Sequence, residues 1–179
     1  MDFAAACASG APLIWTQPHA MSRSSELRCG ESQIGILSFK KSCGSLAVAE
    51  VGPQRWTFKR AGFLSPRVTV RSPNSETDVA IFHPQWSGSG TVEVAGAPQV
   101  HWRCLNFWQT QWAFLRCDNR RVMSFGHHQG FLKASAKLEI DPSAVGDPQA
   151  AMLGVLGWYL MILAADDAAV TVATTAAIV

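Results

Sequence analysis

Two pairs of adjacent residues carry the side chains best suited to acid–base or metal chemistry, His127-His128 and Asp166-Asp167. In an extended segment neighbouring side chains point to opposite faces, so the two imidazoles do not converge on one ligand. The two aspartates directly follow a long uncharged run, and this position is typical of a solvated helix exit. Neither pair predicts catalysis, and we expect a protein that is not an enzyme.

The motifs of phosphate binding and of nucleophilic catalysis are also missing from the sequence. Ser87-Gly-Ser-Gly90 lacks the Lys-Ser/Thr pair and the helix that complete a phosphate-binding loop. No Gly-x-Ser-x-Gly motif occurs, which would mark the nucleophile of an α/β-hydrolase. We therefore predict no cofactor and no catalytic residue.

The cysteines do not form a metal-binding pattern. Their number is odd and no Cys-x-x-Cys pair occurs, whereas structural zinc sites use closely spaced pairs of ligands. Disulfide frameworks are typical of secreted proteins, which pair their cysteines. We predict reduced thiols, no bound metal and a cytoplasmic location. The five cysteines are Cys7, Cys29, Cys43, Cys104 and Cys117.

The charged residues are distributed unevenly along the chain. Residues 1–71 contain nine Lys or Arg and four Asp or Glu, whereas residues 72–179 contain six and nine, so the two parts carry +5 and −3. Four of the cations flank Phe63-Leu64, and an apolar loop tip between cations suits an anionic membrane surface. The alternative is that these cations only keep strand faces soluble and guard sheet edges. The candidate lipid- or anion-binding residues are Lys59, Arg60, Phe63, Leu64, Arg67 and Arg71.

Short segments of alternating polar and apolar residues fill the chain between positions 13 and 140. Turn residues such as Gly52-Pro53 and Gly96-Ala-Pro98 separate them, and the spacing is typical of antiparallel barrels and sandwiches. No helical period interrupts them, so the sequence predicts an all-β fold with one terminal helix. The expected strands are 13–16, 25–29, 33–39, 45–51, 55–59, 67–71, 78–82, 91–94, 100–104, 111–117, 122–125 and 133–140.

The terminal helix is predicted over Pro148–Ala165, a run without any charged residue. Asp147 stands at a favourable N-cap position and Pro148 at the first helical position. A helix that is apolar on all sides must be enclosed by protein or by lipid. A barrel of about twelve strands is too wide for its own side chains to fill, so this helix can occupy its interior. We predict a closed antiparallel barrel that encloses the helix.

The domain prediction that follows is simple. Residues 13–179 form one barrel domain with its central helix at about 148–165, and residues 1–12 form a loosely ordered N-terminus. Tryptophan is frequent, and we interpret Trp56, Trp86, Trp102, Trp108, Trp112 and Trp158 as core and barrel-lining residues rather than a ligand cage.

With its twelve short strands, an acidic-Pro turn and an apolar helix, the chain resembles the tubby C-terminal-like superfamily. That superfamily includes the tubby domain, the LURP-one-related proteins and the phospholipid scramblases. The resemblance spans about residues 13–165 and is greatest to small bacterial members. It rests on the segments Trp56–Phe63, Pro66–Arg71 and Leu156–Leu160. It implies the barrel architecture, and no family binding residue can be matched position by position.

Three functions remain open from the sequence. The first is peripheral binding to anionic membrane lipid through the basic residues named above. The second is a structural or protein-interaction module without affinity for lipid. The third is a membrane-anchored protein in which residues 148–165 span the bilayer, because eighteen apolar residues lie within the spanning range. Nucleic acid is not an expected partner, since the aromatic segment 102–112 contains a single basic residue, Arg103.

Overall fold

The computed structural model describes residues 2–19, 22–41, 44–62, 65–73, 75, 77–128 and 134–176. Side chains are described for these residues except 127–128 and 171–176. The predicted Phe63-Leu64 tip and Cys43 lie outside the described residues.

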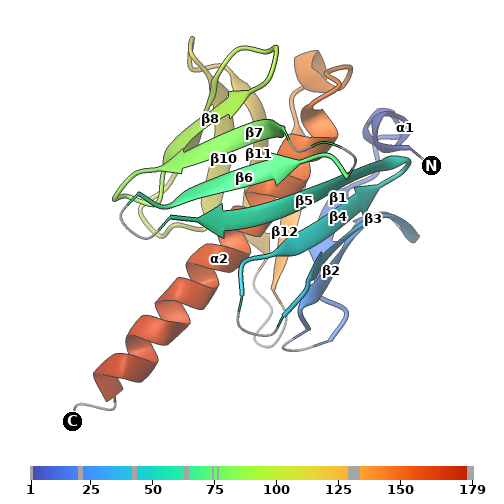
Figure 1. The fold of residues 1–179 in the computed structure, drawn as a ribbon. Coiled ribbons are helices and arrows are strands. Elements are labelled where there is room, and N and C mark those ends of the chain that lie inside the picture. Colours follow the sequence, from blue (N-terminus) through green and yellow to red (C-terminus); the bar gives the residue numbers. More distant parts are fainter. Residues whose placement is uncertain are drawn as a thin grey trace.

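Twelve antiparallel strands form one closed barrel, which confirms the predicted fold class (Figure 1). Each strand pairs with its neighbours in sequence, and β1 closes the barrel by pairing with β12. Closure leaves no unpaired sheet edge. The strands are β1 Leu13–Thr16, β2 Ser24–Cys29, β3 Ser32–Phe39, β4 Ala47–Val51, β5 Gln54–Ala61, β6 Arg67–Arg71, β7 Asp78–Pro84, β8 Gly90–Val94, β9 Val100–Cys104, β10 Gln111–Arg116, β11 Arg121–His128 and β12 Ser135–Ile140.

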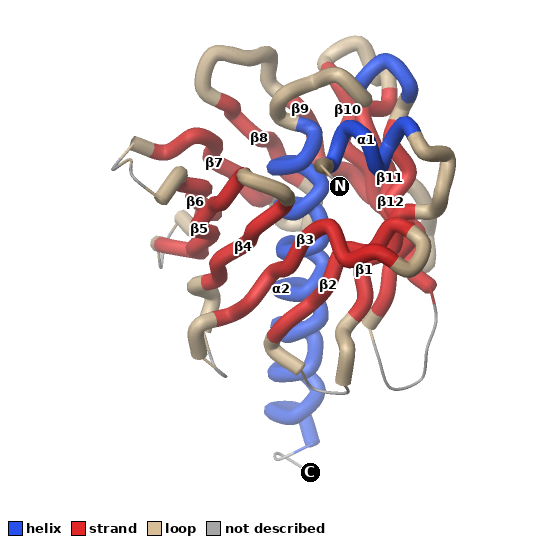
Figure 2. The backbone as a smooth tube through the Cα atoms, turned by 90° about the vertical axis from the view of Figure 1, so that its right-hand side faces the viewer, coloured by secondary structure: helices blue, strands red, loops and turns tan. Residues whose placement is uncertain are grey.

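The C-terminal helix α2 (Ala150–Ala176) runs through the middle of the barrel (Figure 2). From Ala150 to Leu163 every residue except Met161 is buried. The helix begins close to the predicted start, where the Asp147 carboxylate accepts the backbone N–H of Gln149 at 2.9 Å. It does not end near Ala165 as predicted, and continues for eleven residues beyond that position. The barrel is therefore filled by the first half of α2, and the second half projects from it.

The glycines of α2 allow the barrel wall to approach the helix closely. A Cβ atom on Gly157 would lie 2.2 Å from Phe125 Cζ, and one on Gly154 would lie 3.3 Å from Leu138 Cδ2. Large side chains occupy the remaining space, and Trp158 stacks on Trp15 of β1 with ring centroids 6.0 Å apart. The small positions of the helix thus match the large residues of the wall.

The N-terminus forms a short helix, α1 (Phe3–Ala8), instead of the loosely ordered segment that we predicted. The Asp2 carboxylate caps it by accepting the backbone N–H of Ala5 at 2.7 Å. Phe3 is 7% exposed and its ring lies against Gly154 of α2. Helix α1 therefore covers the end of the barrel where α2 begins (Figure 2).

Candidate functional site

The two ends of the barrel are built from different connections. Because neighbouring strands are antiparallel, connections after odd-numbered strands gather at one end and those after even-numbered strands at the other. At the first end α2 emerges, since Arg60 near the end of β5 and Arg23 just before β2 both contact it. We call this the exit end, with connections 17–23, 40–46, 62–66, 85–89, 105–110 and 129–134. The other is the capped end, with connections 30–31, 52–53, 72–77, 95–99, 117–120 and 141–149.

The connections at the exit end are basic and rich in large apolar residues. The described residues of these connections include no Asp or Glu and three basic residues, Arg23, Lys40 and Lys41. Connections at the capped end have the opposite character. Their described residues include a single basic residue, Arg120, and four acidic residues, Glu31, Asp118, Asp141 and Asp147.

Exposed aromatic side chains also lie at the exit end. Trp86, in the connection between β7 and β8, is fully exposed, and Trp108 between β9 and β10 is 79% exposed. Phe107 stands beside Trp108 with the two rings in a T-shaped contact. Our interpretation of Trp86 and Trp108 as core residues is therefore wrong. The other four tryptophans in that prediction are buried.

The predicted basic residues do not form a single face. On β5 the side chains alternate, so Arg60 shares the inward side with buried Phe58, whereas Lys59 points outward. Arg67 and Arg71 of β6 pair with outward positions of β5 and share its outer surface. Successive side chains on a strand point to opposite faces of the sheet. The sequence alone could therefore have shown that Arg60 faces the opposite side of β5 from Lys59.

Two of these four cations are held in ion pairs. Arg60 forms two hydrogen bonds with the Asp167 carboxylate, at 2.7 and 3.0 Å, and this contact raises the pKa of the guanidinium further. Arg71 pairs with Asp78 at 2.6 Å. Lys59 and Arg67 have no ion pair among the described residues, so they are the two predicted cations still available to an anion.

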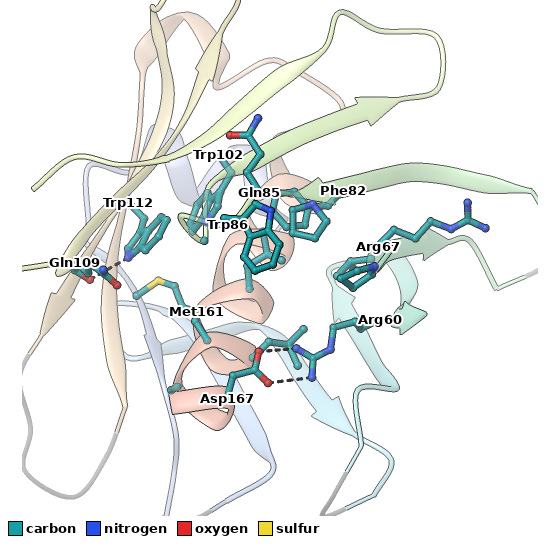
Figure 3. Close-up of a pocket in the computed structure, with 18 residues that line it drawn as sticks. Arg60, Arg67, Phe82, Gln85, Trp86, Trp102, Gln109, Trp112, Met161 and Asp167 are labelled. Atoms are coloured by element: carbon teal, nitrogen blue, oxygen red, sulfur yellow. Dashed lines mark hydrogen bonds and ion pairs between the residues drawn. The ribbon is translucent and has the colours of Figure 1, made fainter. Parts of the chain in front are cut away.

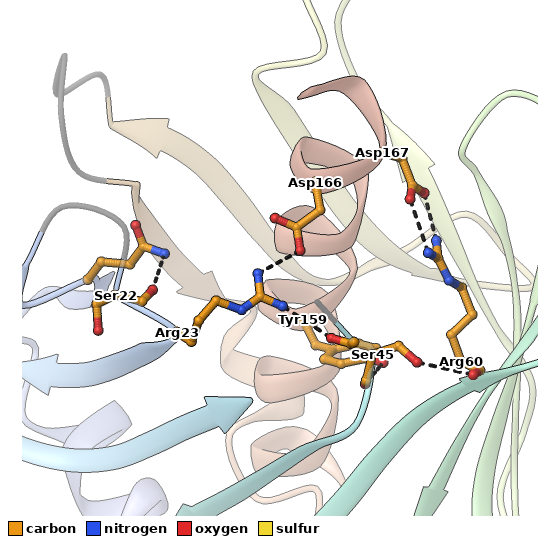
Figure 4. A network of polar contacts seen from close by, with 9 residues as sticks. Ser22, Arg23, Ser45, Arg60, Tyr159, Asp166 and Asp167 are labelled. Atoms are coloured by element: carbon orange, nitrogen blue, oxygen red, sulfur yellow. Dashed lines mark hydrogen bonds and ion pairs between the residues drawn. The ribbon is translucent and has the colours of Figure 1, made fainter. Parts of the chain in front are cut away.

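Polar contacts fix α2 where it leaves the barrel (Figure 4). Arg23 donates to Asp166 at 2.8 Å and lies over the Phe39 ring, 4.3 Å from its centroid. The Tyr159 hydroxyl donates to the backbone carbonyl of Ser45, and burial raises the pKa of that phenol to about 12. Asp166 and Asp167, which we interpreted as a solvated helix exit, are thus partners of barrel-rim arginines.

A cavity of about 480 Å³ opens beside α2 at the exit end (Figure 3). Its wall includes the stacked rings of Trp102 and Trp112, and α2 contributes apolar side chains such as Met161. Trp86, Arg60, Arg67 and Asp167 stand around its opening. The labelled side chains come from strands and exit-end connections on one side and from α2 on the other. This cavity was not predicted, because its walls come from segments distant in the sequence.

The comparisons with known proteins return no match: no family model fits the chain, and no curated protein or solved structure is significantly similar to it.

The described residues contain no group of three or more His, Cys, Asp or Glu side chains that could hold a metal ion. The four described cysteines, Cys7, Cys29, Cys104 and Cys117, are free thiols. Helix α2 is long and apolar enough over Ala150–Val170 to cross a membrane, although more than half of this stretch is buried inside the barrel. Nothing in the described structure indicates catalysis, and the exit end combines a cavity with exposed aromatic side chains and cations.

Proposed function

We propose that this chain is a non-enzymatic, tubby-like barrel module that docks reversibly, as a cytoplasmic protein, on anionic membrane surfaces through its exit end. The observation that carries the proposal is that exposed aromatic side chains and loop cations gather at one end of the barrel, while the described loop carboxylates lie at the other. A closed barrel around an apolar helix is also the architecture that the family resemblance implies.

Aromatic residues at loop tips suit the interface between water and lipid. Trp is enriched there because its ring is apolar and its N–H is polar. Trp86, Phe107 and Trp108 are therefore placed to insert shallowly beside the headgroups. Lys40 and Lys41, in the β3–β4 connection at the same end of the barrel, are exposed. Each basic residue near an anionic surface contributes roughly 1 kcal/mol, so these two with Lys59 and Arg67 give on the order of 4 kcal/mol before screening.

The projecting half of α2 adds an apolar surface at the same end. Ala164, Ala165, Ala168 and Ala169 are exposed, and Val170 is 66% exposed. No charged residue follows Asp167 in the sequence. The exit end thus combines apolar surface, aromatic loop tips and cations, and its described loops carry no acidic residue. A protein partner would not require loops of a single sign of charge, whereas an anionic lipid surface favours them, so lipid is the better-fitting partner.

A membrane-spanning role for residues 148–165 is less compatible with these contacts. Most of that segment fills the barrel, and its removal would expose the inner faces of all twelve strands to water. Docking through the exit end leaves the enclosed half of α2 in place.

The proposal is tested by cosedimentation of the full chain with lipid vesicles. We expect recovery on vesicles that contain phosphatidylglycerol, little recovery on phosphatidylcholine alone, and a decrease as salt rises, because exposed charges are screened over about 8–10 Å at physiological ionic strength. Equal recovery on both vesicle types, or none on either, would contradict the proposal and favour a protein-interaction module.

Variants locate the docking surface. The double change Lys40→Glu with Lys41→Glu should lower recovery on anionic vesicles several-fold, and Trp108→Ser should lower it at every salt concentration. Arg120→Glu is the matched control, because Arg120 is an exposed cation at the capped end. If Arg120→Glu weakens binding as much as the double change does, net charge and not the exit end is responsible.

A further inference from the structure

We propose that the cavity at the exit end binds one acyl chain of an anionic amphiphile, with the chain along α2 and the carboxylate or phosphate near Arg67 and Arg60. The inference goes beyond membrane docking, because a monomeric amphiphile can fill the cavity when no bilayer is present.

The size and lining of the cavity fit such a chain. Its volume of about 480 Å³ lies within the range of small-molecule sites, which is roughly 300–1,000 Å³. Phe82, Trp102 and Trp112 form the wall on the strand side, and Leu160 and Leu163 form the wall on the helix side. Phe82, Leu160 and Leu163 carry no polar side-chain atom, so most of this surface makes no hydrogen-bonding demand on an apolar ligand.

The tryptophan wall is held rigidly. The rings of Trp102 and Trp112 are stacked with centroids 5.3 Å apart and an interplanar angle of 10°. The Trp112 indole N–H donates to the backbone carbonyl of Gln109 at 3.0 Å, so its polar atom is already satisfied. A wall that is formed before the ligand arrives reduces the entropic cost of binding.

The charges at the opening favour an anionic head. Arg60, Arg67 and Asp167 stand at the opening, and the Arg67 guanidinium lies on the outer surface of the barrel, directed away from the interior of the cavity, where the head of a bound chain would emerge into water (Figure 3). Asp167 is bound to Arg60, which leaves Arg67 as the cation without an ion pair among the described residues. Arginine binds carboxylate and phosphate through paired N–H groups, so an anionic head is preferred to a neutral or cationic one.

The experiment uses the full chain and brominated dodecanoate, kept below its critical micelle concentration at pH 8. Bromine quenches tryptophan fluorescence at short range, and three tryptophans line the cavity. We expect saturable quenching with one site per chain, reversed by unbrominated dodecanoate. Dodecanol and dodecylammonium should compete at least tenfold more weakly. Absence of saturable quenching, or equal competition by all three, would overturn the site or its preference for an anion.

A pair of helix variants separates the cavity from the rest of the surface. Ala164→Phe places a ring into the cavity from an exposed position, and should weaken dodecanoate binding at least tenfold. Ala168→Phe, one turn further along α2 and outside the lining, is the matched control. Ala165→Phe serves as a second blocking variant if Ala164→Phe melts at a much lower temperature than the control. Unchanged affinity in both blocking variants would exclude this cavity.

A further experiment with vesicles distinguishes a membrane lipid from a free fatty acid as the source of the acyl chain. Brominated phosphatidylglycerol in vesicles should quench the wild type more than Ala164→Phe when a membrane lipid enters the cavity. Quenching by dodecanoate alone would identify a free fatty acid as the ligand. A third outcome is that vesicles bind the wild type and Ala164→Phe equally well, and that brominated lipid and brominated dodecanoate quench both proteins equally. Membrane docking would then stand and the cavity proposal would fail.

Discussion

The capped end and the exit end of the barrel hold the same helix by different means. At the capped end, α2 packs against the wall and α1 through apolar contacts, such as Phe3 against Gly154. At the exit end it is held by ion pairs at Arg23 and Arg60, and a cavity separates it from part of the wall. One end is closed by packing, and the other is left open around charged residues.

This difference separates stability from binding. Apolar burial contributes most of the free energy of folding, and it is supplied by the inner faces of the strands together with the enclosed half of α2. Ion pairs that are partly exposed contribute little, about 0–1 kcal/mol each. The exit end can therefore carry exposed aromatics and a cavity without a large loss of stability, because the capped end and the lumen already fix the helix.

The largest expected effect comes from a charge placed inside the lumen. Leu156 is fully buried in α2, so Leu156→Asp would bury a carboxylate without a partner. We expect a loss of more than about 4 kcal/mol in the free energy of unfolding, which is enough to prevent folding. Circular dichroism melts and gel filtration measure it.

The matched control for that change is Ala169→Asp, on the same helix beyond the exit end. Ala169 is exposed, so this variant should keep the wild-type melting temperature within a few degrees. Wild-type melting of Leu156→Asp would show that α2 does not fill the barrel in solution. Equal damage by both variants would show that the projecting half also needs enclosure.

A smaller effect is expected from aromatic truncation at the two ends. Phe3→Ala at the capped end removes a buried ring and should lower the free energy of unfolding by about 3 kcal/mol. Phe107→Ala at the exit end removes a ring that is 89% exposed and should change it by less than about 0.5 kcal/mol. Urea denaturation of the two variants gives both values. Similar losses in the two would contradict the division between a packed end and an open end.

The strands and the enclosed helix could be predicted because their signals are local. Alternation along segments such as Arg67–Arg71 places Val68 and Val70 on the inner face, and turn residues mark each break. The uncharged run before Asp166 required enclosure, and a wide barrel required a filling. These two requirements are met by one arrangement, so the fold followed from the sequence.

The exit end could not be predicted in the same way, because its contacts join distant residues. Asp166 and Asp167 resemble the end of a helix in the sequence, yet their arginine partners lie more than a hundred residues earlier and let α2 continue. Hydrophobicity alone cannot separate Trp86 at a loop tip from Trp102 in the wall. The sequence does show that connections after odd-numbered strands are basic and those after even-numbered strands are acidic. This difference can be recognised only after the strands have been assigned to a closed barrel.

The smallest expected effect concerns Tyr159, where α2 meets the exit end. Its buried hydroxyl donates to Ser45, so Tyr159→Phe should cost about 1 kcal/mol at pH 8. An unfolded tyrosine ionises near pH 10, whereas burial raises the pKa of Tyr159 to about 12 in the folded protein.

The direction of the pH effect follows from these two pKa values. Below pH 10 both states keep the proton and the phenol contributes its full stabilisation. Between pH 10 and 12 the unfolded state releases the proton first, so the wild type loses up to about 2 kcal/mol that Tyr159→Phe does not lose. The variant's lower free energy of unfolding should therefore approach that of the wild type as pH rises, and then exceed it. Other titrating groups affect both proteins alike. Urea denaturation at pH 8, 10 and 11 measures the difference in the free energy of unfolding between the two proteins. A difference that stays constant would mean that solvent reaches the phenol. The boundary between the packed and open regions would then lie deeper in the barrel.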